Sequence, residues 1–134
     1  MSMNMKTNSN TDIMLFESEL KVMESLWEKG ALTAGQLAAM MKDYTNWNRN
    51  TTYTVIKKLI AKGAVERSEP NFTCKALVSK EQIQQNKASE VIDKFFDGSA
   101  GVFLSTFVDG RNLSADEIKH LKEIVKKLDK EVTR

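Results

Sequence analysis

The 134-residue sequence is poor in the side chains that bind metals, form disulfides or act as catalytic nucleophiles and bases. Cys74 is the only cysteine and His120 the only histidine, so an internal disulfide and a spaced Cys/His ligand set for zinc or copper are excluded. A Cys–His or Ser–His catalytic pair would depend on that one histidine, which lies in an ordinary charged segment. We therefore predict no metal, no cofactor and no enzymatic activity.

Long apolar runs are also missing. No run approaches the ~20 residues that span a bilayer, and the composition of 41% hydrophobic and 28% charged residues is typical of a globular protein. Residues 1–12 are polar, rich in Asn, Ser and Thr, and lack the apolar centre of a secretory signal, so they are predicted to form a disordered arm. We expect a cytoplasmic protein without membrane contact.

The net charge of +2 is unevenly distributed along the chain. Residues 46–75 carry a net charge of +4, whereas residues 1–45 carry −2 and residues 76–134 carry none. A local excess of positive charge is expected of a protein that binds a polyanion. The basic residues of the central stretch are Arg49, Lys57, Lys58, Lys62, Arg67 and Lys75.

Helical periodicity and capping signals predict two helices near the start. Thr33, with Gln36 three residues later, is typical of a capping box and predicts a helix over residues 34–43. The helix before it is predicted over residues 17–29 from apolar residues that share one face. These residues are Phe16, Leu20, Met23 and Trp27.

A third helix and a hairpin follow. Asn48 as N-cap and Gly63 as a left-handed end predict a helix over residues 49–62. Two β-prone runs, residues 64–67 and 72–78, are separated by a turn that contains Pro70. Three helices followed by a hairpin indicate a winged helix-turn-helix, in which the third helix enters the major groove and the hairpin is the wing. We assign this DNA-binding domain to residues 13–78.

The remaining residues, 79–134, are predicted to be all helical. A helix over residues 80–96 and an apolar segment over 102–108 precede a last helix that Ser114 and Glu117 open as a capping box. So much apolar surface is hard to bury within one chain, so we predict a helical dimerisation region and a mainly α fold with a small β-hairpin wing. The predicted dimer contacts, at heptad spacing on the last helix, are Ile118, Leu121, Val125 and Leu128.

The third helix carries a polar and cationic face opposite its apolar stripe, which we predict to contact DNA. Its first turn can reach bases and phosphates, Thr54 can touch a base edge or a thymine methyl, and the lysines can hold the backbone. The alternative is that the threonines only start the helix, but threonine is a mediocre helix former, which favours DNA contact. The predicted DNA-binding residues are Asn50, Thr51, Tyr53, Thr54, Lys57 and Lys58.

Two further side chains allow alternative interpretations. Trp47 could stack on a base, but an aromatic residue just before a helix is more often part of the core. Cys74 could sense oxidation, but its alternation with Phe72 and Ala76 favours a small buried hydrophobe.

Four segments are similar to one family of repressors: SELKVMESLWEKGALTAGQLA, WNRNTTYTVIKKLIAKGAVER, LVSKE and FFDGSAGVFLSTFVDGRNLSADEIKHLKEIV. Together they resemble the penicillinase-repressor family, the BlaI/MecI/CopY group of winged-helix repressors, from about Ile13 to Lys130. The resemblance implies a homodimer that binds a palindromic operator of the TACA/TGTA type and represses resistance or stress genes until it is induced. It also implies DNA-facing positions for Asn50, Thr51, Tyr53, Thr54 and Lys58.

The sequence departs from this family in ways that bear on affinity and induction. Arg49 stands where members often have proline, and Asn50 and Tyr53 stand where they often have a basic residue. The copper branch has a C-terminal cysteine cluster that is missing here, which excludes copper sensing by that route. The β-lactam branch is inactivated by proteolysis at an Asn-Phe bond, to which Thr106-Phe107 corresponds, so a protease is a candidate partner.

A second hypothesis is a winged-helix module for protein–protein contact, with the last helix docking onto another protein. It explains the apolar C-terminal region equally well. It does not explain the charge of +4 over residues 46–75 or the polar face of the third helix. These two features therefore favour sequence-specific DNA binding.

Overall fold

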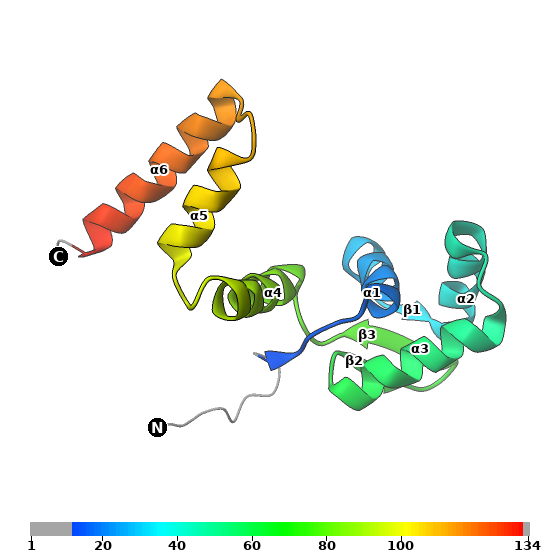
Figure 1. Ribbon diagram of the computed structural model, residues 1–134. Helices are drawn as coiled ribbons and strands as arrows, with labels where there is room; N and C mark the ends of the chain where they lie inside the picture. The colour runs from blue at the N-terminus through cyan, green and yellow to red at the C-terminus, as the bar shows by residue number, and fades with distance from the viewer. Residues whose placement is uncertain (1–11, 133–134) are drawn as a thin grey trace. The chain divides into compact units, whose positions relative to one another are not determined.

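The computed structural model describes residues 12–132 (Figure 1). The predicted disordered arm therefore lies, apart from Asp12, outside the described residues. The chain divides into two compact units, one ending at Glu90 and the next beginning at Val91. This boundary falls inside α4 (Lys80–Phe95), later than the boundary predicted at residue 78, because Ile83 of α4 is buried in the first core.

The first unit contains the three predicted helices: α1 (Glu17–Lys29), α2 (Ala34–Thr45) and α3 (Arg49–Lys62). The Thr33–Gln36 capping box is present, since the Gln36 N–H donates to Thr33 Oγ1 (3.1 Å) and the Thr33 N–H donates to Gln36 Oε1 (2.8 Å). Asn48 caps α3 by accepting the Thr51 N–H at 2.8 Å. Gly63 ends α3 with a φ of 82°, which favours glycine.

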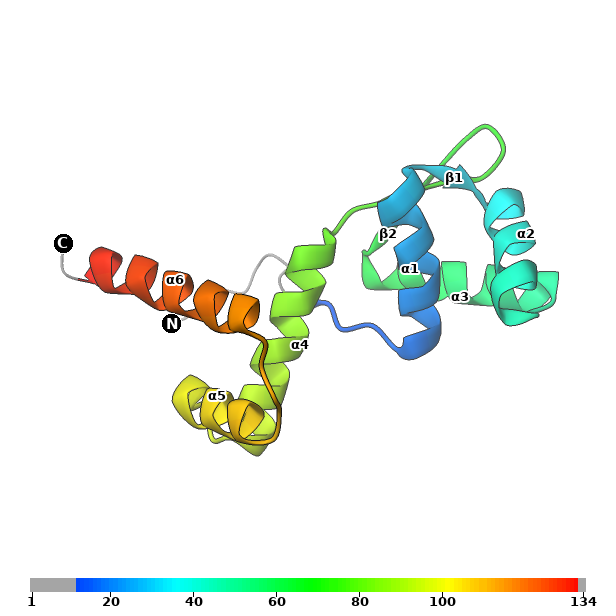
Figure 2. The same ribbon diagram turned by 90° about the horizontal axis from the view of Figure 1, so that it is seen from above.

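The predicted hairpin is part of a three-stranded antiparallel sheet. Its strands are β1 (Leu32–Thr33), β2 (Val65–Ser68) and β3 (Thr73–Ala76), in the order β1-β3-β2. β1 pairs with β3 in the register Leu32 to Cys74. This strand was not predicted, because two residues are too few to show an alternating pattern. Figure 2 shows the β2–β3 loop, the tip of the predicted wing, projecting past β1. The mainly helical fold with a small β wing is confirmed.

The buried face of α1 differs from the predicted one. Glu19 is only 1% exposed and shares the buried face with Val22, Met23 and Leu26. Phe16, predicted to belong to the stripe, is the N-cap residue and is 69% exposed. The prediction was wrong here because a charged residue, Glu19, occupies a core position that an apolar pattern cannot detect.

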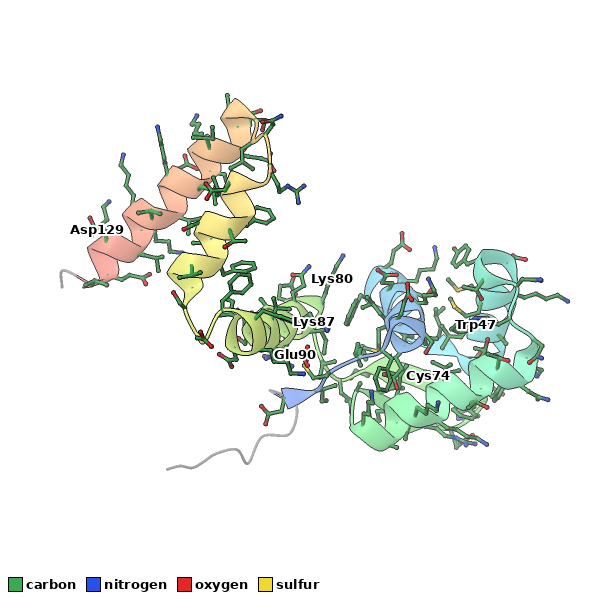
Figure 3. All side chains as sticks on the ribbon, viewed as in Figure 1. Trp47, Cys74, Lys80, Lys87, Glu90 and Asp129 are labelled. Carbon is green, nitrogen blue, oxygen red and sulfur yellow. The ribbon has the colours of Figure 1, made fainter. Side chains whose placement is uncertain are left out.

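Cys74 belongs to the core of the first unit, between α1 and α3 in the view of Figure 3. Burial raises the pKa of its thiol above the ordinary value, which keeps the group protonated and unreactive at neutral pH. Trp47 is half-buried and packs against the same core. Both environments agree with the structural interpretation of these residues. The core is made mainly by Val22, Met23, Leu26, Leu37, Met41, Val55, Ile56, Leu59, Val65 and Cys74.

The second unit contains the end of α4, α5 (Ala100–Asp109) and α6 (Ala115–Val132). The predicted capping box of α6 is present, with the Glu117 N–H donating to Ser114 Oγ at 3.1 Å. No residue between 91 and 132 is buried. None of the helices that the structure describes combines the length and the apolar character needed to cross a membrane.

Candidate nucleic-acid interface

The face of α3 that points away from the core is polar and cationic. Successive residues of an α-helix are turned by roughly 100°, so positions 50, 54, 57 and 58 fall opposite the buried positions 52, 55, 56 and 59. The residues at positions 50, 54, 57 and 58 are all exposed. We call this the outward face of α3; it consists of Asn50, Thr54, Lys57 and Lys58, with Thr51 at its edge.

The N-terminus of α3 is capped by Asn48 and has no acidic side chain in its first turn. Asn48 Oδ1 accepts hydrogen bonds from both the backbone N–H and the hydroxyl of Thr51, at 2.8 and 3.1 Å. The first turn contains no acidic residue, so nothing in that turn neutralises the partial positive charge of the helix end. Thr54 donates its hydroxyl to the Asn50 carbonyl at 2.9 Å, which leaves its methyl group and oxygen lone pairs available.

The lysines of α3 fall into two groups. Lys57 and Lys58 are exposed, and within residues 12–132 no carboxylate forms an ion pair with either. Lys62 instead pairs with buried Glu19 at 2.5 Å and donates to the Met14 carbonyl at 3.0 Å. Lys62 belongs to the basic central stretch of the sequence, but its ammonium group binds groups of the protein itself.

Tyr53 lies beside the outward face rather than on it. Its ring is half-buried against Phe72 of the wing, and its hydroxyl accepts a hydrogen bond from Arg49 at 2.8 Å. Sequence reasoning did not assign a contact to Arg49. The signal was available, because residues four apart on a helix are neighbours and an Arg–Tyr pair at that spacing interacts.

The wing carries charges of both signs close together. Arg67 pairs with Glu69 at 2.6 Å, and this hydrogen bond is the main reason why the pKa of the Glu69 carboxyl lies below its ordinary value. Asn71 and Phe72 both have positive φ angles, of 71° and 51°. The wing therefore holds one arginine in a defined position beside α3.

The predicted dimer contacts form one apolar stripe along α6. Ile118, Val125 and Leu128 are 42%, 62% and 54% exposed, and Leu121 is half-buried. An open groove of about 530 Å³ lies between this stripe and the end of α5. The candidate cleavage residues, Thr106 and Phe107, are exposed and lie inside α5.

Residues 12–132 contain no group of three or more His, Cys, Asp or Glu side chains arranged to hold a metal ion. On the outward face of α3, Asn50 can donate to and accept from base edges, Thr54 can accept through its hydroxyl oxygen, and the lysines can neutralise phosphates.

Several known proteins are similar to this chain. The chain is 29% identical over 112 residues to the methicillin resistance regulatory protein MecI of Staphylococcus aureus strain N315, covering 82% of this chain and 91% of MecI. It is 22% identical over 111 residues to the penicillinase repressor of Bacillus licheniformis, covering 81% and 87% of the two chains. A MarR family protein from Bacillus stearothermophilus is similar in structure, with a TM-score of 0.45, 20% identity, and coverage of 94% of this chain and 81% of that chain. The model of the penicillinase repressor family matches residues 15–127, and the chain belongs to that family.

Proposed function

We propose that the chain represses transcription as a homodimer bound to a two-fold symmetric operator of the TACA/TGTA type. The observation that carries this proposal is the outward face of α3, which is exposed, polar and cationic within a helix-turn-helix followed by a wing. Family membership supports a regulator rather than an enzyme. The controlled genes would be resistance or stress genes, as the names of the relatives suggest for those proteins.

On this proposal α3 lies in the major groove with its first turn toward the bases. Asn50 and Thr54 would read base edges. The Asn50 side-chain amide can donate and accept, whereas Thr54, whose hydroxyl proton goes to the Asn50 carbonyl, would accept through Oγ1 or touch a thymine methyl. Backbone N–H groups of the first turn, beside the Asn48 cap, would contact the phosphate nearest the helix end. Lys57 and Lys58 would hold the flanking backbone, which positions the helix without reading sequence.

The occupant that we propose for the apolar stripe of α6 is a second copy of the chain. Its residues repeat at heptad spacing, as in helices that pair with one another. Residues 76–134 carry no net charge, so two copies would not repel each other. A symmetric dimer would present its two α3 helices to half-sites about 34–36 Å apart or a multiple of that distance.

From the family resemblance we propose that a protease relieves repression by cutting the Thr106–Phe107 bond. Both residues are exposed, but the bond lies within the hydrogen-bonded helix α5. Cleavage would therefore require local opening of α5, and its rate would follow the population of the opened helix.

Substitutions on α3 test the proposed contacts. Thr54→Val removes a hydroxyl from the outward face and should weaken binding to the dyad about tenfold, with a smaller effect on a scrambled duplex. Lys58→Ala should weaken binding to both duplexes by the same factor and lower the salt slope by about 1. Fluorescence anisotropy titrations with the purified variants measure both quantities.

Thr52→Val is the matched control. The Thr52 side chain is buried, and its hydroxyl has no hydrogen-bond partner among the residues that the structure describes. The same chemical change there should leave DNA affinity unchanged and stability unchanged or slightly higher. If Thr54→Val and Lys58→Ala bound both duplexes like the wild type, α3 would not be the DNA-binding helix, and a protein-binding role would be favoured.

A further inference from the structure

Four side chains from α3 and the wing form a continuous stack. The Arg49 guanidinium carbon lies 4.8 Å from the centre of the Tyr53 ring, and Tyr53 meets Phe72 edge to face with 5.7 Å between ring centres. The Arg67 guanidinium carbon lies 3.7 Å from the centre of the Phe72 ring. We call Arg49, Tyr53, Phe72 and Arg67 the cation–aromatic stack. It joins the first turn of α3 to the wing.

The backbone at Phe72 indicates that this arrangement is imposed by its surroundings. A φ of 51° is rare for a bulky side chain, because the left-handed conformation brings Cβ close to the following carbonyl. Phe72 is held there by its carbonyl, which accepts the Ala34 N–H at 2.9 Å, and by the two ring contacts. Strained residues of this kind persist where several contacts determine the conformation, and they cluster at functional sites.

Stacking leaves the hydrogen-bonding edges of the two arginines available. A guanidinium group that lies on an aromatic face keeps its N–H donors in its own plane, pointing sideways. Arg49 spends one donor on the Tyr53 hydroxyl, and Arg67 spends one on Glu69. The Arg67 side chain is 48% exposed, and Arg49 is also exposed. Each arginine therefore retains donors that suit a phosphate oxygen.

We propose that the cation–aromatic stack is a phosphate clamp: Tyr53 and Phe72 are positioning residues that hold Arg49 and Arg67 against the DNA backbone, beside the contact made by the outward face of α3. This inference rests on the proposed function. The ligand is the phosphodiester backbone of the bound duplex, so the clamp adds affinity without adding sequence preference. It also helps to fix the wing relative to α3, because the aromatic pair joins the two beyond their shared core.

The arginines are tested first. Arg49→Gln and Arg67→Gln should each weaken binding to the dyad and to a scrambled duplex by the same factor, about three- to tenfold, and lower the salt slope by about 1. The variant that combines Arg67→Gln with Glu69→Gln keeps the net charge of the wing. It should lose as much affinity as Arg67→Gln alone. Such a loss would come from the missing arginine contact, because the net charge of the wing is unchanged.

The positioning role is tested with Phe72. Phe72→Leu keeps an apolar side chain but removes the aromatic face, and it should weaken binding as much as Arg67→Gln. Adding Arg67→Gln to Phe72→Leu should then cost little more, because the two residues act as a unit. Phe72→Tyr keeps the ring and should bind like the wild type. A thermal melt of each variant reports whether it folds. If Phe72→Leu does not fold, the arginine variants and Phe72→Tyr test the clamp without it.

The outcomes separate this inference from the proposed function. If the wild type showed no preference for the dyad, the proposed function and the clamp would both be overturned. If the wild type preferred the dyad but the two arginine variants kept its affinity and salt slope, the clamp alone would be overturned. The same holds if Phe72→Leu folded and bound like the wild type, or if Phe72→Tyr folded and bound as weakly as Arg67→Gln.

Discussion

Replacing Val125 and Leu128 together with aspartate is expected to convert the proposed dimer to a monomer and to lower operator affinity about 10²–10⁴-fold. Both side chains are more than half exposed on the apolar stripe of α6, so the isolated chain gains little from burying them. Two charges placed there would have to be buried against a second copy, which is costly. The loss of affinity follows because linking two binding modules raises avidity by about that factor.

The matched control places two aspartates at positions 119 and 127, on the opposite face of the same helix. Lys119 and Lys127 are exposed and fall outside the stripe. Molar mass from light scattering should show a dimer for the wild type and for the control, and a monomer for the Val125→Asp/Leu128→Asp variant. Helicity should be measured alongside by circular dichroism. A stripe variant that remained dimeric and helical would place the interface elsewhere.

Lys62→Met is expected to destabilise the first unit by about 2–4 kcal/mol. Glu19 is 1% exposed, and one of its carboxylate oxygens accepts from Lys62 and from the Phe16 N–H, at 2.5 and 2.8 Å. Its other oxygen has no partner among the described residues. Removal of the ammonium group leaves the buried Glu19 carboxylate without a positive partner. The expected loss of folding free energy is smaller than for a fully buried pair, because the Lys62 side chain is 30% exposed. Thermal unfolding should show a melting temperature lower by about 10–20 °C.

Two further variants identify the cause of that loss. Adding Glu19→Gln to Lys62→Met removes the buried charge but keeps an oxygen for the Phe16 N–H, and it should restore most of the stability. Lys57→Met removes an exposed lysine from the same helix and should change stability by no more than about 0.5 kcal/mol. Equal melting temperatures for Lys62→Met and Lys57→Met would show that the Glu19–Lys62 pair is not structural.

The helices of the first unit could be predicted because their ends carry specific chemistry. Asn48 and Gly63 cap α3 through contacts within a few residues, and such local contacts can be inferred from spacing alone. β1 and the buried position of Glu19 depend instead on residues far along the chain. β1 exists because Leu32 pairs with Cys74, and Glu19 is tolerated because Lys62 reaches it.

The candidate site shows the same division. Asn50, Thr54, Lys57 and Lys58 could be placed on one exposed face because a helix has a fixed period. The helical period alone could not show that Tyr53 is half-buried beside this face. Its half-buried position depends on Phe72, which the left-handed turn of the wing brings to α3. The DNA contacts themselves remain predictions.

Binding of the purified protein to a duplex from its own promoter that contains a TACA/TGTA dyad, compared with a scrambled duplex over a range of salt, tests the central claim most directly. The account predicts a preference for the dyad of ~10³-fold or more, and affinity that falls steeply as salt rises because phosphate contacts release counterions. Equal and weak binding to both duplexes would contradict it, and the outward face of α3 would then have another partner.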